Sequence, residues 1–227
     1  MSSGINIWGG RNTNLLSMRG KAIGEDNRSI ANAVMCRMEK MYRENYFSYR
    51  IGGLSACQVA ENEDEVLQLI LLNDVGIINF YANPKIIKMS TFKVIARIAC
   101  YSAANGERAL QASPQWFEIQ YLDLDTWTVK ETRLNYPVTN SAWHEMTHLR
   151  GASYEEDVLP GTRVLTGDEL TALNAYTDEE KFLALLGGHP LAMIYDGSEV
   201  LYSAIEVENF ILGNCNLTLN KSKERLI

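Results

Sequence analysis

Residues 116–151 read WFEIQYLDLDTWTVKETRLNYPVTNSAWHEMTHLRG and combine the pattern of a hairpin with that of a helix. Apolar and polar side chains alternate at the start of Trp116–Leu124, which is the period of a strand with one buried face. Trp127–Leu134 follows after Asp125-Thr126, a pair suited to a turn. We therefore expect the two segments to form an antiparallel hairpin.

A short helix is expected directly after this hairpin. Pro137 ends the second strand, because proline cannot donate to a strand ladder. The segment from about Thr139 to Arg150 then predicts a helix. Gly151 closes it, since glycine readily adopts the left-handed conformation in which many helices end.

Helices and hairpins alternate along the rest of the chain. Apolar spacing and capping residues predict helices at residues 30–45, 62–72, 91–103 and 168–186, the last broken near 176–178. Strands are expected at 49–54 and 75–81, and a second hairpin at 191–204. Because these elements lack the regular spacing of strand–helix–strand units, we expect an α+β fold of interleaved helices and antiparallel hairpins.

The length of 227 residues and the ordinary globular composition predict a single main domain, at residues 28–213. Residues 1–27 are rich in glycine, asparagine, serine and arginine, which predicts an extended arm. Residues 214–227 are mostly polar and predict a tail.

The charge balance excludes some classes of partner. Lysine and arginine number 21 against 28 aspartates and glutamates, a formal charge of −7, so the chain is a poor partner for nucleic acid or anionic lipid. No stretch approaches the roughly 20 apolar residues that span a bilayer, and the N-terminus does not resemble a signal peptide. The four cysteines are widely spaced, which indicates reduced thiols. We expect a cytoplasmic protein, or a virion component, that binds neither nucleic acid nor membranes.

One motif on the expected helix carries chemistry. His144-Glu145-Met146-Thr147-His148 is an HExxH sequence. Residues four apart lie on one face of a helix, so both imidazoles can reach one metal ion. Glu145 can reach the same site and serve as general base for a water that the metal activates. The motif therefore predicts a metal-dependent hydrolase.

This segment resembles the active-site helix of the zincin metallopeptidases, within residues 138–186. The resemblance implies a zinc peptidase that acts on protein or peptide substrates, with His144 and His148 as zinc ligands and Glu145 as the catalytic base. It also implies a third ligand downstream, for which we take Asp168. Gly161-Thr162 ahead of Asp168 adds a fainter resemblance to the deuterolysin group.

Four side chains are candidates for the third metal ligand. Besides Asp168, the candidates are Glu169, Asp157 and Tyr154, the last at the position where metzincins have a third histidine. Arg150 departs from the zincin pattern, because that position is usually apolar in the family. A charge there is expected to face solvent or to pair.

Two other titratable residues are expected to be inert. Cys100 lies near the end of the helix expected at 91–103 and is interpreted as a buried thiol without a chemical role. His189 lies in a Gly-Gly-His-Pro turn and is interpreted as a loop histidine.

The alternative to an enzyme is a structural or assembly protein. In that hypothesis the arm at residues 1–27 reaches neighbouring subunits of a virion or another multi-subunit complex, and an acidic inhibitor of another enzyme is a third hypothesis.

Overall fold

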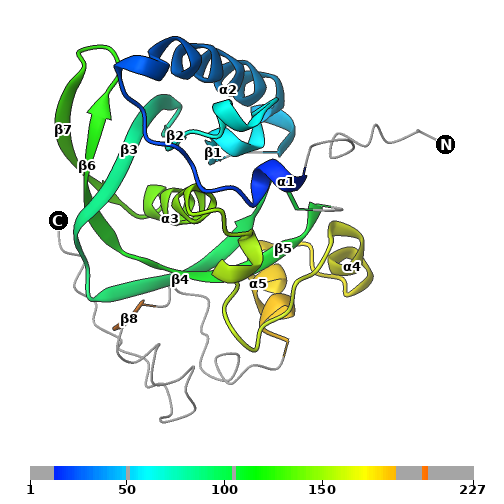
Figure 1. Ribbon diagram of the computed structural model, residues 1–227. Helices are drawn as coiled ribbons and strands as arrows, with labels where there is room; N and C mark the ends of the chain where they lie inside the picture. Colours follow the sequence, from blue (N-terminus) through cyan, green and yellow to red (C-terminus); the bar gives the residue numbers. More distant parts are fainter. Residues whose placement is uncertain (1–12, 50–51, 104–105, 188–200, 204–227) are drawn as a thin grey trace.

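The computed structural model describes residues 13–49, 52–103, 106–187 and 201–203 (Figure 1). Two antiparallel sheets and the helices around them form an α+β fold, as the sequence predicts. Within these described residues, no helix is long and apolar enough to cross a membrane.

The larger sheet has five strands in the order β1-β2-β3-β6-β7. These are β1 (Gly53–Ser55), β2 (Leu69–Asp74), β3 (Ile77–Met89), β6 (Trp116–Asp123) and β7 (Thr128–Asn135). The hairpin predicted at Trp116–Leu134 is confirmed, because Phe117 pairs with Leu134 and Ile119 with Thr132 across β6 and β7.

Helix α2 (Arg28–Tyr49) covers one face of the larger sheet (Figure 1). Val34 and Met38 on this helix are fully buried in one cluster with Leu54 of β1 and Leu71 of β2. The helix predicted at 30–45 is confirmed, and its apolar face provides the main core beneath β1 and β2.

The smaller sheet has three strands in the order β5-β4-β8. These are β4 (Phe92–Ala99), β5 (Arg108–Pro114) and β8 (Leu201–Ser203). Helices α4 (Gly167–Ala172) and α5 (Asp178–Leu186) replace the helix predicted at 168–186, with the break where the sequence indicates it. Leu185 of α5 packs against Leu110 of β5 in a second core cluster.

Helix α3 (Val138–Leu149) lies between the two sheets and contacts strands of both (Figure 1). The helix predicted at 139–150 is thereby confirmed. Asn140 ties it to the smaller sheet: its Nδ2 donates to Arg97 O of β4 at 3.1 Å, and its Oδ1 accepts from Gln111 Nε2 of β5 at 2.7 Å. These bonds fix the smaller sheet beside the first turn of α3.

Two predicted helices are wrong. Most of residues 91–103 form the strand β4 (Phe92–Ala99), in which Val94, Ile95 and Ala96 are all buried. A short apolar run covered on both faces has no clear period, so local spacing cannot separate a buried strand from a helix. Residues 62–72 begin instead with a 3₁₀ turn, η3 (Glu63–Glu65), and continue into β2, whose residues Leu69–Leu72 are buried.

The described part of the expected arm lies against the domain. It contains α1 (Thr13–Leu16) and the 3₁₀ turn η1 (Glu25–Asn27), and Leu15 and Ile23 are buried. Lys21 exchanges backbone hydrogen bonds of 2.8 Å with Val66 O and Gln68 N. Residues 1–12, most of the hairpin expected at 191–204, His189 and the tail lie outside the described residues, so the domain boundaries stay a prediction.

Candidate metal centre

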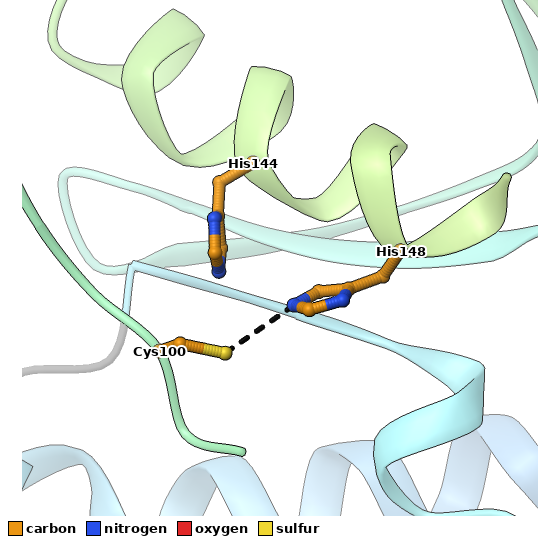
Figure 2. Close-up of side chains that lie close together, drawn as sticks. All are labelled: Cys100, His144 and His148. Atoms are coloured by element: carbon orange, nitrogen blue, oxygen red, sulfur yellow. Dashed lines mark hydrogen bonds between the residues drawn. The ribbon is translucent and has the colours of Figure 1, made fainter. Parts of the chain in front are cut away.

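The two histidines of the motif point from α3 toward the end of β4 (Figure 2). His144 and His148 are four residues apart, so their rings stand on the same face of the helix. Their ring centroids lie 4.7 Å apart, and the two ring planes are nearly perpendicular. Both side chains are buried, with 4% and 3% of the residue exposed.

Cys100, directly after β4, completes a group of three potential ligands (Figure 2). Its Sγ lies 3.3 Å from His148 Nε2. One ligand atom from each of Cys100, His144 and His148 lies within 4.8 Å of the others, and we call these residues the Cys–His–His group. An ion with bonds of about 2.0–2.3 Å holds tetrahedral ligands about 3.3–3.7 Å apart, so these three ligand atoms would have to move somewhat closer together around a single ion.

The ring nitrogens on the far sides of the histidines have acceptors. His144 Nδ1 donates to Asp157 Oδ2 at 3.1 Å, and His148 Nδ1 donates to Ala152 O at 3.2 Å. Because carboxylates and carbonyls only accept, both rings carry a proton on Nδ1, so Nε2 is the nitrogen that each ring can offer to a metal ion. Histidines that ligate metals are usually oriented by such a bond.

Two buried atoms beside this group lack hydrogen-bond partners within the part of the chain that the structure describes. These are His144 Nε2 and Glu145 Oε2. An unpartnered polar atom in the interior is costly unless something outside the protein satisfies it. A thiolate and two imidazoles are ligands that suit zinc and other transition metals, so the residues present fit a bound metal ion.

Burial and neighbouring charges shift the pKa values at this centre. Burial, with a further contribution from His144, lowers the pKa of His148 to about 3, so this ring is neutral. Burial alone would lower the pKa of His144, but Asp157, Cys100 and Glu145 together raise it well above its ordinary value. Burial raises the pKa of Glu145 to about 7.

Glu145 is held against β1. The Ser55 hydroxyl hydrogen-bonds to its carboxylate, and a Cβ at Gly53 would lie 2.9 Å from Glu145 Cγ. Gly53 therefore permits the close approach of the strand to this side chain. Contacts from the larger sheet therefore place the Glu145 carboxylate, whereas Cys100 follows a strand of the smaller sheet.

A pocket of about 540 Å³ opens beside Cys100 and His148. Its walls come from the residues after β4, from the end of α3, from the turn η5 (Tyr154–Asp157) and from the end of α1 with the residue that follows it. Ser102 and Tyr154 give it polar groups, and Leu16 and Ala103 give it apolar ones. The pocket provides space for a small ligand next to the Cys–His–His group.

The candidate third ligands are distributed differently from the prediction. Asp168 and Glu169 are exposed on α4, and neither is a member of the Cys–His–His group. Tyr154 donates its hydroxyl to Glu107, and Asp157 contacts the far nitrogen of His144. The thiol of Cys100, interpreted from sequence as inert, lies beside the two histidines and is a further candidate ligand. Only its short distance to His148 reveals this, since no local spacing links residues 48 positions apart.

Neither a protein-family model nor a curated protein matches this chain. Solved structures of peptide deformylases are similar in fold. The enzyme from Thermotoga maritima has a TM-score of 0.54 at 18% identity, over 64% of this chain and 92% of that one. The class I type b enzyme from Acinetobacter baumannii, bound to Met-Ala-Ser, gives the same TM-score, identity and coverage. Peptide deformylase 1B from Arabidopsis thaliana has a TM-score of 0.53 at 24% identity, over 74% of this chain and 83% of that one.

These similarities correct the family resemblance. The fold is that of peptide deformylases, so the resemblance to the zincin metallopeptidases and to the deuterolysin group is wrong. The reason is physical: five residues of HExxH specify one face of one helix and nothing about the sheets that surround it.

Proposed function

We propose that the chain is a metal-dependent hydrolase that removes a formyl group from the N-terminal amine of a peptide. The observation that carries this proposal is the convergence of Cys100, His144 and His148, whose ligand atoms lie within 4.8 Å of one another next to Glu145. The fold shared with peptide deformylases, one of them bound to Met-Ala-Ser, supports a formylated peptide as the substrate.

In this proposal the Cys–His–His group holds a divalent cation, with zinc as the first expectation. The cation would supply Lewis acidity, which polarises the formyl carbonyl and lowers the pKa of water. Cys100 binds as the thiolate and releases its proton. His144 and His148 offer Nε2, because their Nδ1 atoms donate to Asp157 and Ala152.

Glu145 is the proposed general base and acid. Its buried Oε2 lacks a partner among the described residues and is free to accept a proton from the attacking water. The water oxygen bonds to the formyl carbon, and the bond between that carbon and the peptide nitrogen breaks. Glu145 passes the proton to the departing amine, so the products are formate and a peptide with a free N-terminus.

The test measures metal content and formate release together. Purified protein is assayed by mass spectrometry for bound metal and with formyl-Met-Ala-Ser as substrate. Glu145→Gln should keep the metal and lose activity by about 10²–10⁴-fold. Cys100→Ser should lose the metal, while Cys36→Ser, the same substitution at an exposed thiol on α2, should leave both readouts unchanged.

Two outcomes would overturn the proposal. One is a parent protein that neither contains nor takes up a stoichiometric metal ion. The other is metal-loaded protein that leaves formyl-Met-Ala-Ser intact. Cleavage of internal bonds in longer peptides without a formyl group would instead favour the general peptidase that the motif predicts.

A further inference from the structure

A continuous chain of hydrogen bonds lies behind His144, on the side away from the other two ligands. Arg150 Nη2 donates to Thr147 Oγ1 at 2.9 Å, and Thr147 Oγ1 donates to Asp157 Oδ1 at 2.8 Å. The other carboxylate oxygen, Asp157 Oδ2, accepts from His144 Nδ1 at 3.1 Å. We call Arg150, Thr147 and Asp157 the relay.

All donors in the relay point the same way. The guanidinium has no acceptor, so the Thr147 oxygen must accept from it. The hydroxyl proton of Thr147 goes to Asp157 Oδ1 at 2.8 Å, which is closer than its other acceptor, Trp143 O at 3.3 Å. The carboxylate then accepts at both oxygens and has the His144 N–H as its second donor. Hydrogen bonds in such a chain polarise one another, which strengthens the bond that fixes the ring of His144.

Helix geometry and burial support the relay. His144, Thr147 and Arg150 are three residues apart in turn, so they follow one face of α3. The Asp157 side chain is 5% exposed and Thr147 is fully buried, whereas Arg150 is exposed. A buried carboxylate requires donors, and Arg150 brings a compensating charge to it from the surface through Thr147.

We propose that Thr147, Asp157 and Arg150 are positioning residues that set the metal affinity of the Cys–His–His group through the orientation of His144. The inference rests on the metal site of the proposed function, but concerns affinity and not the reaction. The relay also explains the charge at position 150, which a buried helix of this kind would otherwise disfavour. Loss of a residue that orients a metal ligand typically weakens metal binding about 10–100-fold.

The test titrates the full chain with cobalt(II) against a competing chelator, and reads the absorption band of cobalt bound to the Cys100 thiolate. Thr147→Val keeps the volume and removes the hydroxyl, so it should weaken binding about 10–100-fold, as should Asp157→Asn. Thr147→Ser keeps the hydroxyl and should restore most of the affinity. Arg150→Met, at the exposed end, should have a smaller effect in the same direction.

Helix α3 offers a matched control. Thr139 is fully buried on the same helix, and its hydroxyl lacks a partner among the described residues. Thr139→Val should therefore leave the cobalt affinity and the spectrum unchanged. Thermal unfolding of the metal-free variants, followed by circular dichroism, separates a loss of fold from a loss of affinity.

The proposal is overturned if Thr147→Val and Asp157→Asn fold and bind cobalt as tightly as the parent. If Thr147→Val does not fold, unchanged affinity in both Arg150→Met and Asp157→Asn overturns it equally. A parent that binds cobalt tightly but releases no formate defeats the proposed function and leaves the relay standing. A parent that binds no metal defeats both.

Discussion

Gly151, which closes α3, links the metal centre to the segment after α1. Its backbone φ is +79°, and its N–H donates to His148 O at 2.9 Å. A Cβ here would lie 2.6 Å from Ser17 O and 3.0 Å from Arg19 N, which are backbone atoms with little freedom to move. Gly151→Ala therefore combines strain in the left-handed region with overpacking against a neighbouring segment.

The two contributions can be separated with other glycines of the same chain. Strain in the left-handed region costs about 1–2 kcal/mol and overpacking about 1–3 kcal/mol, so Gly151→Ala should lower the free energy of unfolding by about 2–5 kcal/mol. Gly76 has a φ of +88°, and a Cβ there meets no described atom within 4 Å. Gly76→Ala should therefore lower the free energy of unfolding by the strain alone, about 1–2 kcal/mol. Gly167→Ala adds neither left-handed strain nor overpacking, so it should leave the free energy of unfolding unchanged or raise it slightly.

The assay is equilibrium unfolding in urea, followed by tryptophan fluorescence and circular dichroism. With a denaturant slope of about 3 kcal/mol per molar, a loss of about 3 kcal/mol lowers the midpoint by about 1 M. The slope should stay the same in all three variants, since the surface exposed on unfolding does not change. Equal losses of stability in Gly151→Ala and Gly76→Ala would contradict this prediction, because the segment at Ser17 would then not pack against the end of α3.

Three further predictions concern stability. Val75 is 97% exposed and has a φ of +47°, and the glycine after it also has a positive φ. Asparagine tolerates this conformation better than valine, so Val75→Asn should raise the free energy of unfolding by about 1 kcal/mol and the unfolding temperature by about 2–4 °C. Leu185 is fully buried against Leu110, and Leu185→Ala should cost about 2–5 kcal/mol in urea unfolding, whereas a cost below 1 kcal/mol would contradict the packing. Hydrogen bonds from Lys130 and Thr126 lower the pKa of Asp123, so its carboxylate stabilises the fold above pH about 4, and that stabilisation is lost as the pH falls. Asp123→Asn should thus lower the unfolding temperature at pH 7 and less so near pH 3, and a deficit that does not depend on pH would count against this assignment.

Local pattern alone was sufficient for the elements with a strong period. The alternation in Trp116–Leu124, the helix that ends at Gly151 and the apolar face of α2 are each encoded within one segment, and each forms as expected. The same holds for His144 and His148, because residues four apart on any helix share a face.

Position 100 shows what local pattern could not provide. Residues 91–103 are apolar enough to form a helix or a strand, and only pairing with β5 and contact with α3 select the strand β4. That choice places Cys100 3.3 Å from His148, while Asp168 remains on the surface.

Spacing along the backbone was enough to place two imidazoles and a carboxylate together on one short stretch of helix. Folding, in contrast, brings the Cys100 thiol close to the two imidazoles and the Asp157 carboxylate to the far ring nitrogen of His144. Both depend on contacts between segments distant along the chain. Such contacts follow from how the sheets pack around α3, which no short window of residues records.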